Sequence, residues 1–327
     1  MTTSQTVLGI SNAIVDVLAH VEDDFLTGIG APKGSMTLID QERAEDIYGE
    51  MGPAKEMSGG SVANTIAGFA SLGGRASYIG RVRDDPLGRI FQHDMQSLGV
   101  EVRLPPAADG APTARSYILI TPDGQRTMQT YLGASLELSG KDVTEQTTGR
   151  PDVMMLEGYV WDTPQQREAA NNALQIAQSN NIAVVLSLSD DQCVDRHRSD
   201  FLDALSGQVR LIIADDSEVM RLFATDTLDE ALDNAAASDT IFAVTRSEKG
   251  SVIVDGSDRI FQDAYPVDHV VDTTGAGDAY AAAFLYGWTS GRSLKDCAEL
   301  GTKVATAVIQ QVGPRLEKDV LADILER

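Results

Sequence analysis

The sequence predicts an α/β fold, in which a central, mostly parallel sheet is flanked by helices on both faces and a small, discontinuous β-sheet lies beside it. Three observations predict this fold. Strand and helix patterns alternate through the second half of the chain, as in parallel sheets covered by helices. Two stretches of short alternating strands interrupt the first half. A glycine turn enters residues 279–288, which are too alanine-rich and too uniformly apolar for a surface helix.

The length and charge of the chain limit its class. Its 327 residues can bury a large core, and length alone allows one large α/β domain or two smaller ones. No linker composition or internal repeat divides the sequence, so we expect a single domain over residues 1–327. The net charge of −23 argues against nucleic-acid binding, because an acidic surface repels the phosphate backbone.

The sequence also predicts a compartment. Residues 1–5 are polar and lack the basic region and apolar core of a secretory signal, and no apolar run is long enough to span a bilayer. We therefore expect a cytoplasmic protein that binds no membrane. Cys193 and Cys297 are too few and too far apart for a disulfide framework or a zinc pattern, and the four histidines show no metal-ligand spacing.

The chain opens with a short buried strand at residues 7–10. Asn12 and Asp16 follow its end, where open α/β sheets place ligand-binding groups. The Asp16 carboxylate could accept hydrogen bonds from two neighbouring hydroxyls of a ligand. The alternative is an ordinary polar strand end.

Gly59 and Gly60 precede an alanine- and glycine-rich helix predicted at residues 61–72. Small residues allow a ligand to approach the backbone closely. Asn64 lies about one turn into this helix and faces back toward the glycines. Close helix packing is the other explanation, and both can hold together.

Two stretches in the first half, residues 17–40 and 100–132, consist of short alternating pieces broken by glycine and proline. In the second stretch, residues 113–120 show the alternating pattern of a strand and residues 122–124 form a turn. Residues 126–131 then form the returning strand of a hairpin. These pieces predict strands of a small sheet outside the main one.

From Asp152 onward, strands and helices alternate. The predicted strands are residues 153–156, 183–188, 209–214 and 240–245. The predicted helices are residues 164–179, 200–205, 217–223 and 294–312, and the last of them stops at Gly313 and Pro314.

The glycine turn before the apolar helix suits phosphate chemistry. Gly275 and Gly277 can point successive N–H groups at one spot, and the helix dipole adds positive charge there. Asp278 then sits in the first turn, where it could accept the proton of a hydroxyl that receives a phosphoryl group. The alternative is a tight turn in which Asp278 only caps the helix.

Two motifs in this order resemble the signatures of the ribokinase-like (PfkB) carbohydrate and nucleoside kinases. Residues 59–64 (GGSVAN) are similar to the first signature, and residues 272–278 (DTTGAGD) are similar to the second. The resemblance covers nearly the whole chain. Residues 125–134 (QRTMQTYLGA) further resemble a stretch typical of bacterial adenosine kinase homologues.

The resemblance implies a ribokinase-like fold whose small sheet is a lid, formed here by roughly residues 15–50 and 100–132. A lid would keep water away from the phosphoryl group. The implied catalytic residues are Asp278, Gly275, Ala276, Gly277 and the lid arginine Arg126. The implied acceptor-binding residues are Asn12, Asp16, Gly59, Gly60, Asn64 and Asp278. For Arg126, a solvated hairpin arginine is the alternative.

The resemblance also implies a nucleotide site and metal ions. The residues implied to bind ATP are Asp215, Thr245, Gly250, Gly275, Gly277 and Gln310. Glu218 would hold Mg²⁺ through water, and Asp272 and Thr274 resemble positions near a monovalent cation (K⁺) site in some relatives. Asp215 replaces a family asparagine, and Ser247 replaces a family glycine.

The leading hypothesis is an ATP-dependent kinase that phosphorylates the 5′-hydroxyl of a nucleoside, converting adenosine to AMP. A sugar kinase of the ribokinase or fructokinase type on the same scaffold is the first alternative. A nonenzymatic nucleoside or sugar binder is the second. A base-binding site needs an apolar or aromatic surface, for which the candidates are Tyr117, Tyr131, Tyr159 and Trp161. The protein could be a monomer or a homodimer paired through lid strands.

Overall fold

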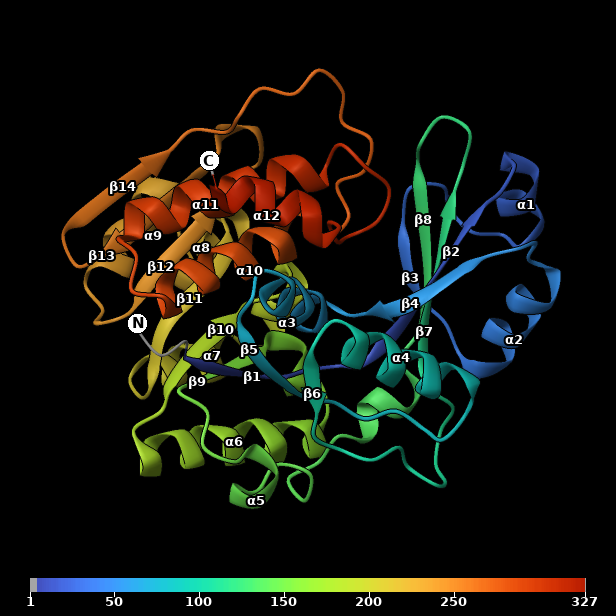
Figure 1. Cartoon of the computed structure of the whole chain (residues 1–327), viewed down its shortest axis with the longest axis horizontal. Coiled ribbons are helices and arrows are strands. Elements are labelled where there is room, and N and C mark those ends of the chain that lie inside the picture. Colours follow the sequence, from blue (N-terminus) through green and yellow to red (C-terminus); the bar gives the residue numbers. More distant parts are fainter. Residues whose placement is uncertain (1–4, 327) are drawn as a thin grey trace.

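The computed structural model describes residues 5–326 and contains two sheets (Figure 1). The prediction that the chain has no secretory signal rests on residues 1–5. Of these, only Gln5 lies within the described residues. The main sheet has nine strands in the order β14-β13-β12-β11-β10-β9-β1-β5-β6. From β6 to β12 neighbouring strands are parallel, whereas β13 and β14 are antiparallel additions. Their bounds are β1 (Thr6–Ile10), β5 (Arg75–Ile79), β6 (Val100–Val102), β9 (Val153–Glu157), β10 (Ala183–Ser187), β11 (Val209–Asp215), β12 (Ile241–Thr245), β13 (Ser251–Asp255) and β14 (Asp258–Gln262).

Helices cover both faces of this sheet, which confirms the predicted α/β fold. Val7 belongs to one apolar core and Leu8 to the other, because successive side chains of a strand point to opposite faces. The first core takes side chains from α3 (Ser61–Ser71), α4 (Pro86–Ser97), α10 (Ala276–Thr289) and α11 (Leu294–Val308). The second takes side chains from α6 (Pro164–Asn180), α7 (Asp191–Leu205), α8 (Asp216–Phe223) and α9 (Leu228–Ala236).

The second sheet stands beside the α/β body, at the right of Figure 1, in the order β3-β8-β7-β2-β4. Its strands are β2 (Ile14–His20), β3 (Met36–Leu38), β4 (Lys55–Gly59), β7 (Ala114–Ile120) and β8 (Arg126–Tyr131). Two boundaries differ from the expected ones. β4 joins this sheet although it lies outside residues 15–50 and 100–132, and β6 instead pairs with β5 at the edge of the main sheet.

The remaining elements are short connections and terminal pieces. They are α1 (Asp23–Gly28), α2 (Gln41–Glu50), α5 (Glu145–Thr148), α12 (Lys318–Glu326) and the 3-10 turns η1 (Gly133–Glu137), η2 (Gly158–Trp161) and η3 (Ser247–Lys249). Within residues 5–326, no helix combines the length and the apolar character needed to cross a membrane.

One predicted boundary was wrong in each of two helices. α7 begins at Asp191 rather than at residue 200, because Asp190 caps it by accepting a hydrogen bond from the N–H of Cys193. Its backbone leaves helical geometry at His197, which breaks the apolar period upstream of residue 200. α11 ends at Val308 rather than at residue 312, before the glycine that served as the stop signal.

Candidate active site

The predicted acceptor-binding residues meet where β1, β4 and β9 end and β2 begins. Asn12 and Asp16 are buried, with 3% and 6% of their surfaces exposed. Asp16 lies on β2, in register with Met57 of β4. A Cβ on Gly59 would collide with the Asp16 carboxylate, and a Cβ on Gly60 would come within 2.6 Å of the Asn12 carbonyl oxygen. Glycine at both positions therefore lets the start of α3 approach these two residues closely.

The entrance of α10 is the predicted glycine turn. Gly275 has a left-handed backbone (φ +73°) and is the N-cap of the helix, and a Cβ there would collide with Pro314. Among the described residues, the N–H groups of Gly277 and Asp278 have no hydrogen-bond partner. A Cβ on Gly277 would face open space. The turn can therefore offer main-chain donors to an anion.

Asp278 does not cap its own helix. One carboxylate oxygen accepts a hydrogen bond from Ser61 Oγ at 2.7 Å, and the other accepts one from Asn64 Nδ2 at 3.1 Å. Burial raises the pKa of Asp278 to about 6, against the opposing effects of Ser61, Asn64 and Arg315. The carboxylate thus points across to α3 and has a pKa that leaves it mostly ionised at neutral pH.

Two other carboxylates near Asp278 have raised pKa values. Burial raises the pKa of Asp16 to about 7; Arg315 opposes this rise and Asp278 adds to it. Burial also raises the pKa of Glu157, at the end of β9, to about 7. The Glu157 carboxylate accepts hydrogen bonds from the N–H groups of Asn12 and Val62, so it joins β1 to the first turn of α3.

The arginine on the second sheet, Arg126, reaches the glycine turn. It forms an ion pair with Asp272 and lies 3.4 Å from Thr274 Oγ1. Asp272, which is 2% exposed, also accepts hydrogen bonds from the N–H groups of Thr274 and Gly313, both at 2.7 Å. Burial lowers the pKa of Arg126, and its Nε has no hydrogen-bond partner among the described residues. The guanidinium is therefore buried beside the predicted anion site and does not project into solvent.

The predicted metal residue Glu218 lies at the start of α8, where it forms a capping box with Asp215. Asp215 accepts a hydrogen bond from the Glu218 N–H, and the Glu218 carboxylate accepts one from the Asp215 N–H. Burial, followed by the charge of Asp215, raises the pKa of Glu218 to about 8, and Asp190 and Asp191 add to the rise. This oxygen-rich group of side chains has the donor chemistry that Mg²⁺ prefers.

The remaining predicted nucleotide-binding residues lie farther along the sheet edge. Thr245 ends β12 and bonds to the carbonyl of Ala214, and Gly250 (φ +81°) would collide with Gln262 if it carried a Cβ. Gln310 is exposed and bonds to the carbonyl of Thr306. Ser247 has φ +50°, which explains why a family member would carry glycine there.

A cavity of about 370 Å³ lies between the second sheet and the segment that follows α11. Leu18, Met57 and Ile120 line it from the sheet, and Val312 and Arg315 line it from the other side. Leu18 shares a sheet face with Asp16, two residues away on β2. The wall on the sheet face that carries Asp16 is therefore aliphatic at Leu18, Met57 and Ile120, although Asp16 itself does not line the cavity and His20 and Lys55 also do.

The aromatic candidates for a base-binding surface lie elsewhere, and none of them lines this cavity. Tyr117 is fully buried, with its hydroxyl on the carbonyl of Ala44. Tyr131 lies beside Arg115. Tyr159 and Trp161 belong to η2, where Trp161 packs edge-on against the ring of Phe201.

Sequence reasoning missed four residues that hold this site together: Ser61, Glu157, Gln166 and Arg315. Gln166 donates hydrogen bonds to Asn12 Oδ1 at 2.6 Å and to the carbonyl of Ser135 at 3.1 Å. Glu157 could have been found, because an acid directly after four buried apolar residues marks a strand end. Gln166 and Arg315 carry no comparable local signal.

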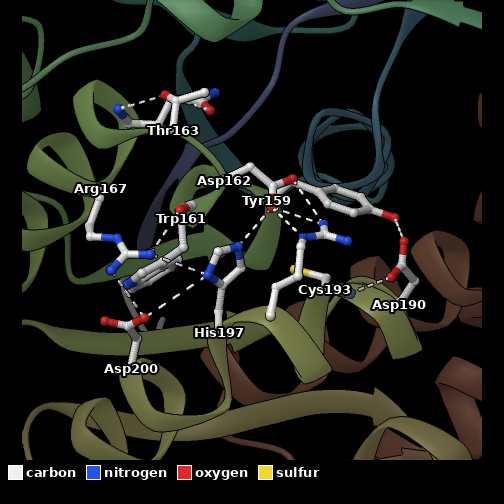
Figure 2. Close-up of polar contacts among 11 residues, drawn as sticks. Tyr159, Trp161, Asp162, Thr163, Arg167, Asp190, Cys193, His197 and Asp200 are labelled. Carbon is white, nitrogen blue, oxygen red and sulfur yellow. Dashed lines mark hydrogen bonds and ion pairs between the residues drawn. The ribbon is translucent and has the colours of Figure 1, made fainter. Parts of the chain in front are cut away.

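A second polar cluster lies beyond the ends of β9 and β10 (Figure 2). Asp162, Cys193 and His197 place ligand-type atoms within 4.8 Å of one another, although their spacing showed no metal pattern. Figure 2 shows His197 between Asp162 and Arg167, with contacts of 2.7 Å and 3.4 Å. Arg196 also binds both oxygens of Asp162. Because arginine already neutralises Asp162, we interpret the cluster as an ion-pair network that supports the kinked α7.

The chain is similar over most of its length to kinases from other organisms. An adenosine kinase from Sinorhizobium meliloti is 47% identical, with 98% of this chain and 99% of that one covered and a TM-score of 0.89. A probable sugar kinase from Rhizobium etli is 46% identical, with 99% of each chain covered and a TM-score of 0.89. The 5-dehydro-2-deoxygluconokinase of Bacillus subtilis is 26% identical over 268 residues, 77% of this chain and 81% of that protein.

The family model described as pfkB family carbohydrate kinase matches residues 34–319, most of the chain. Kinases of this family use ATP and a divalent metal, and they phosphorylate a sugar or nucleoside hydroxyl. With its two signature motifs meeting at Asn64 and Asp278, this chain belongs to the pfkB family of carbohydrate kinases.

Proposed function

We propose that the chain is an ATP-dependent nucleoside kinase that transfers a phosphoryl group to the 5′-hydroxyl of adenosine. The observation that carries the proposal is the aliphatic wall beside Asp16. Leu18, Met57 and Ile120 offer an apolar surface on which a base can lie, next to a carboxylate suited to ribose hydroxyls. Whole-chain similarity to a protein described as an adenosine kinase supports the same acceptor.

In the proposed complex, each side of the ribose meets a different polar group. Asp16 accepts hydrogen bonds from the ribose hydroxyls. Asn12, in the segment between β1 and β2, and Asn64 of α3 present amide groups. Asp278 faces the 5′-hydroxyl. Gly59 and Gly60 let the start of α3 lie directly against Asp16 and Asn12, which brings these residues and Asn64 to the same site.

Asp278 receives the proton of the 5′-hydroxyl as the phosphoryl group moves. A pKa of about 6 suits this role, because the carboxylate is ionised at neutral pH and still basic enough to take a proton late in the transfer. The N–H groups of Gly275 and Gly277 stabilise the transferring oxygens, whereas the predicted donor Ala276 would first have to release its hydrogen bond to the Thr273 carbonyl. Arg126 adds positive charge from the second sheet, beside the same turn.

The nucleotide lies along the sheet edge from Thr245 and Gly250 toward Gln310. Asp215 and Glu218 form the group of oxygen donors that would hold Mg²⁺, with Glu218 acting through metal-bound water. Mg²⁺ would neutralise the charge of the nucleotide phosphates. The role of Asp272 and Thr274 at a K⁺ site stays a prediction: the Asp272 carboxylate already bonds to Arg126, Thr274 and Gly313, so a cation there would need main-chain oxygens.

The second sheet acts as a lid in this proposal. Its contact with the phosphate turn through Arg126 would exclude water from the acceptor hydroxyl. The chain then works as one kinase domain made of the α/β body and this lid, as a monomer or as a homodimer.

A sugar acceptor is the second candidate, because the Rhizobium etli relative is described as a probable sugar kinase and the Bacillus subtilis relative as a 5-dehydro-2-deoxygluconokinase. A screen of ADP formation with Mg-ATP and adenosine, inosine, ribose, fructose or 5-dehydro-2-deoxygluconate separates the two. We expect kcat/KM to be highest for adenosine. Higher kcat/KM for a free sugar would refute the nucleoside proposal, and tight adenosine binding without ADP formation would indicate a binding protein.

A further inference from the structure

The Arg315 side chain donates hydrogen bonds to Ser58, Asn64 and Asp94, and no sequence motif predicted this residue. It follows Gly313 and Pro314 in the segment after α11, and its guanidinium is largely buried, with the side chain 10% exposed. Its Nη1 donates to Ser58 Oγ at 2.9 Å and to Asp94 Oδ2 at 3.0 Å, and its Nη2 donates to the Ser58 carbonyl at 2.6 Å. One end of the guanidinium is therefore anchored to β4 and α4.

The edge of the guanidinium formed by Nε and Nη2 also binds Asn64. Arg315 Nε and Nη2 lie 3.0 Å and 2.8 Å from Asn64 Oδ1. A guanidinium has only donors, so the Asn64 atom that faces it must be the amide oxygen. The Asn64 NH₂ group is thereby turned to the opposite side, where Asp278 accepts its hydrogen bond. The orientation of this amide, usually ambiguous, is fixed by its two neighbours.

The charge of Arg315 also acts on the site. It favours the ionised forms of both Asp278 and Asp16, against the effect of burial. The charged groups around Asp278 are Asp16 from β2, Glu157 from β9 and Arg315, and Asp94 from α4 pairs with the far side of Arg315. Arg315 is thus the positive charge among three carboxylates that face the acceptor region.

We propose that Arg315 is a positioning residue of the phosphoryl transfer: it locks the Asn64 amide so that its NH₂ group faces Asp278, and it places a positive charge near that carboxylate. This inference rests on the proposed role of Asp278. Arg315 itself acts through Asn64 and Asp278.

Two substitutions separate orientation from charge. Arg315→Met removes both, whereas Arg315→Lys keeps the charge but cannot bind Asn64 and Ser58 with a planar fork. We expect kcat to fall about 100-fold in Arg315→Met and about tenfold in Arg315→Lys, because small misplacements of reacting groups have effects of this size. The acid limb of the kcat pH profile should move to higher pH in Arg315→Met alone. The KM for ATP should stay within about threefold in both.

Asp94→Asn is the matched control, because it weakens the anchor of Arg315 on α4 and leaves the Asn64 contact intact. It should lower the melting temperature without moving the acid limb. If Asp94→Asn and Arg315→Met lose kcat equally, and the acid limb of the pH profile moves in neither variant, Arg315 has a purely structural role. That result would overturn the inference.

A double-mutant cycle keeps the test decisive if Arg315→Met does not fold. If Arg315 acts through the amide, Arg315→Lys should change kcat little once Asn64 is alanine; additive losses would contradict the inference. Carboxyl NMR titration of Asp278 in the wild type and Arg315→Met, or Arg315→Gln if methionine prevents folding, gives a readout independent of turnover. A wild type inactive on every acceptor refutes the proposed function, whereas an unchanged Asp278 titration refutes the Arg315 inference alone.

Discussion

Replacing Asp278 with asparagine should abolish turnover and, at the same time, stabilise the fold above neutral pH. The amide cannot take the hydroxyl proton. It can still accept a hydrogen bond from Asn64 Nδ2 and donate one to Ser61 Oγ, so both contacts of the carboxylate have replacements. Nucleotide binding should be largely unchanged, because the main-chain amides of the turn remain.

The gain in stability follows from the raised pKa of Asp278. Its folded value of about 6 exceeds the ordinary 3.8, so the folded state favours the protonated form. The stability linked to this group is full below pH 3.8 and is lost as the pH rises through 6. A difference of about two pKa units corresponds to about 3 kcal/mol, an upper limit because the side chain is only partly buried and water screens it.

Thermal unfolding of the wild type and Asp278→Asn measures this effect. About 1–3 kcal/mol at pH 8 corresponds to a rise in Tm of about 1–4 °C for a chain of this size. The gap should shrink as the pH falls to 5. A coupled ADP assay should give no turnover by the variant. Near-normal kcat would refute the role of Asp278, and a lower Tm for the variant at pH 8 would refute the account of its burial.

Three further predictions test the site. First, kcat/KM for adenosine should fall as the pH drops below about 6, where Asp278 takes up a proton; a flat profile between pH 5 and 8 would contradict this. Second, Arg126→Met should lower kcat about 100-fold and change the KM for adenosine less than about threefold, because the guanidinium acts mainly in the transition state. A raised KM with unchanged kcat in steady-state kinetics would instead mean that Arg126 only binds substrate. Third, Leu18→Ser should raise the KM for adenosine about tenfold and leave that for ATP unchanged, because it removes apolar contact from the base wall; equal KM values for adenosine in variant and wild type would place the base elsewhere.

Much of the fold could be predicted because its signals are local. Alternating strands and helices, a glycine turn and a buried apolar helix each lie within one short segment. The turn at Gly275 was found from glycine spacing alone, and the structure adds the reason for glycine there, since Pro314 occupies the space of a Cβ.

The parts of the site that sequence could not predict depend on contacts between distant segments. Arg315 meets Asn64, which lies 251 residues earlier, and Gln166 meets Asn12, which lies 154 residues earlier. Neither residue has a local pattern that indicates such a partner. The start of α7 was missed for a different reason: the backbone departs from helical geometry at His197, so its apolar period does not continue across that residue.

The most direct test of the account is to identify the product formed from adenosine and Mg-ATP by the wild type and by Asp278→Asn. Phosphorus–proton correlation NMR locates the new phosphate on the ribose. We expect 5′-AMP from the wild type and no phosphorylated nucleoside from the variant. Phosphate on another hydroxyl, or 5′-AMP formed equally fast by both proteins, would contradict it.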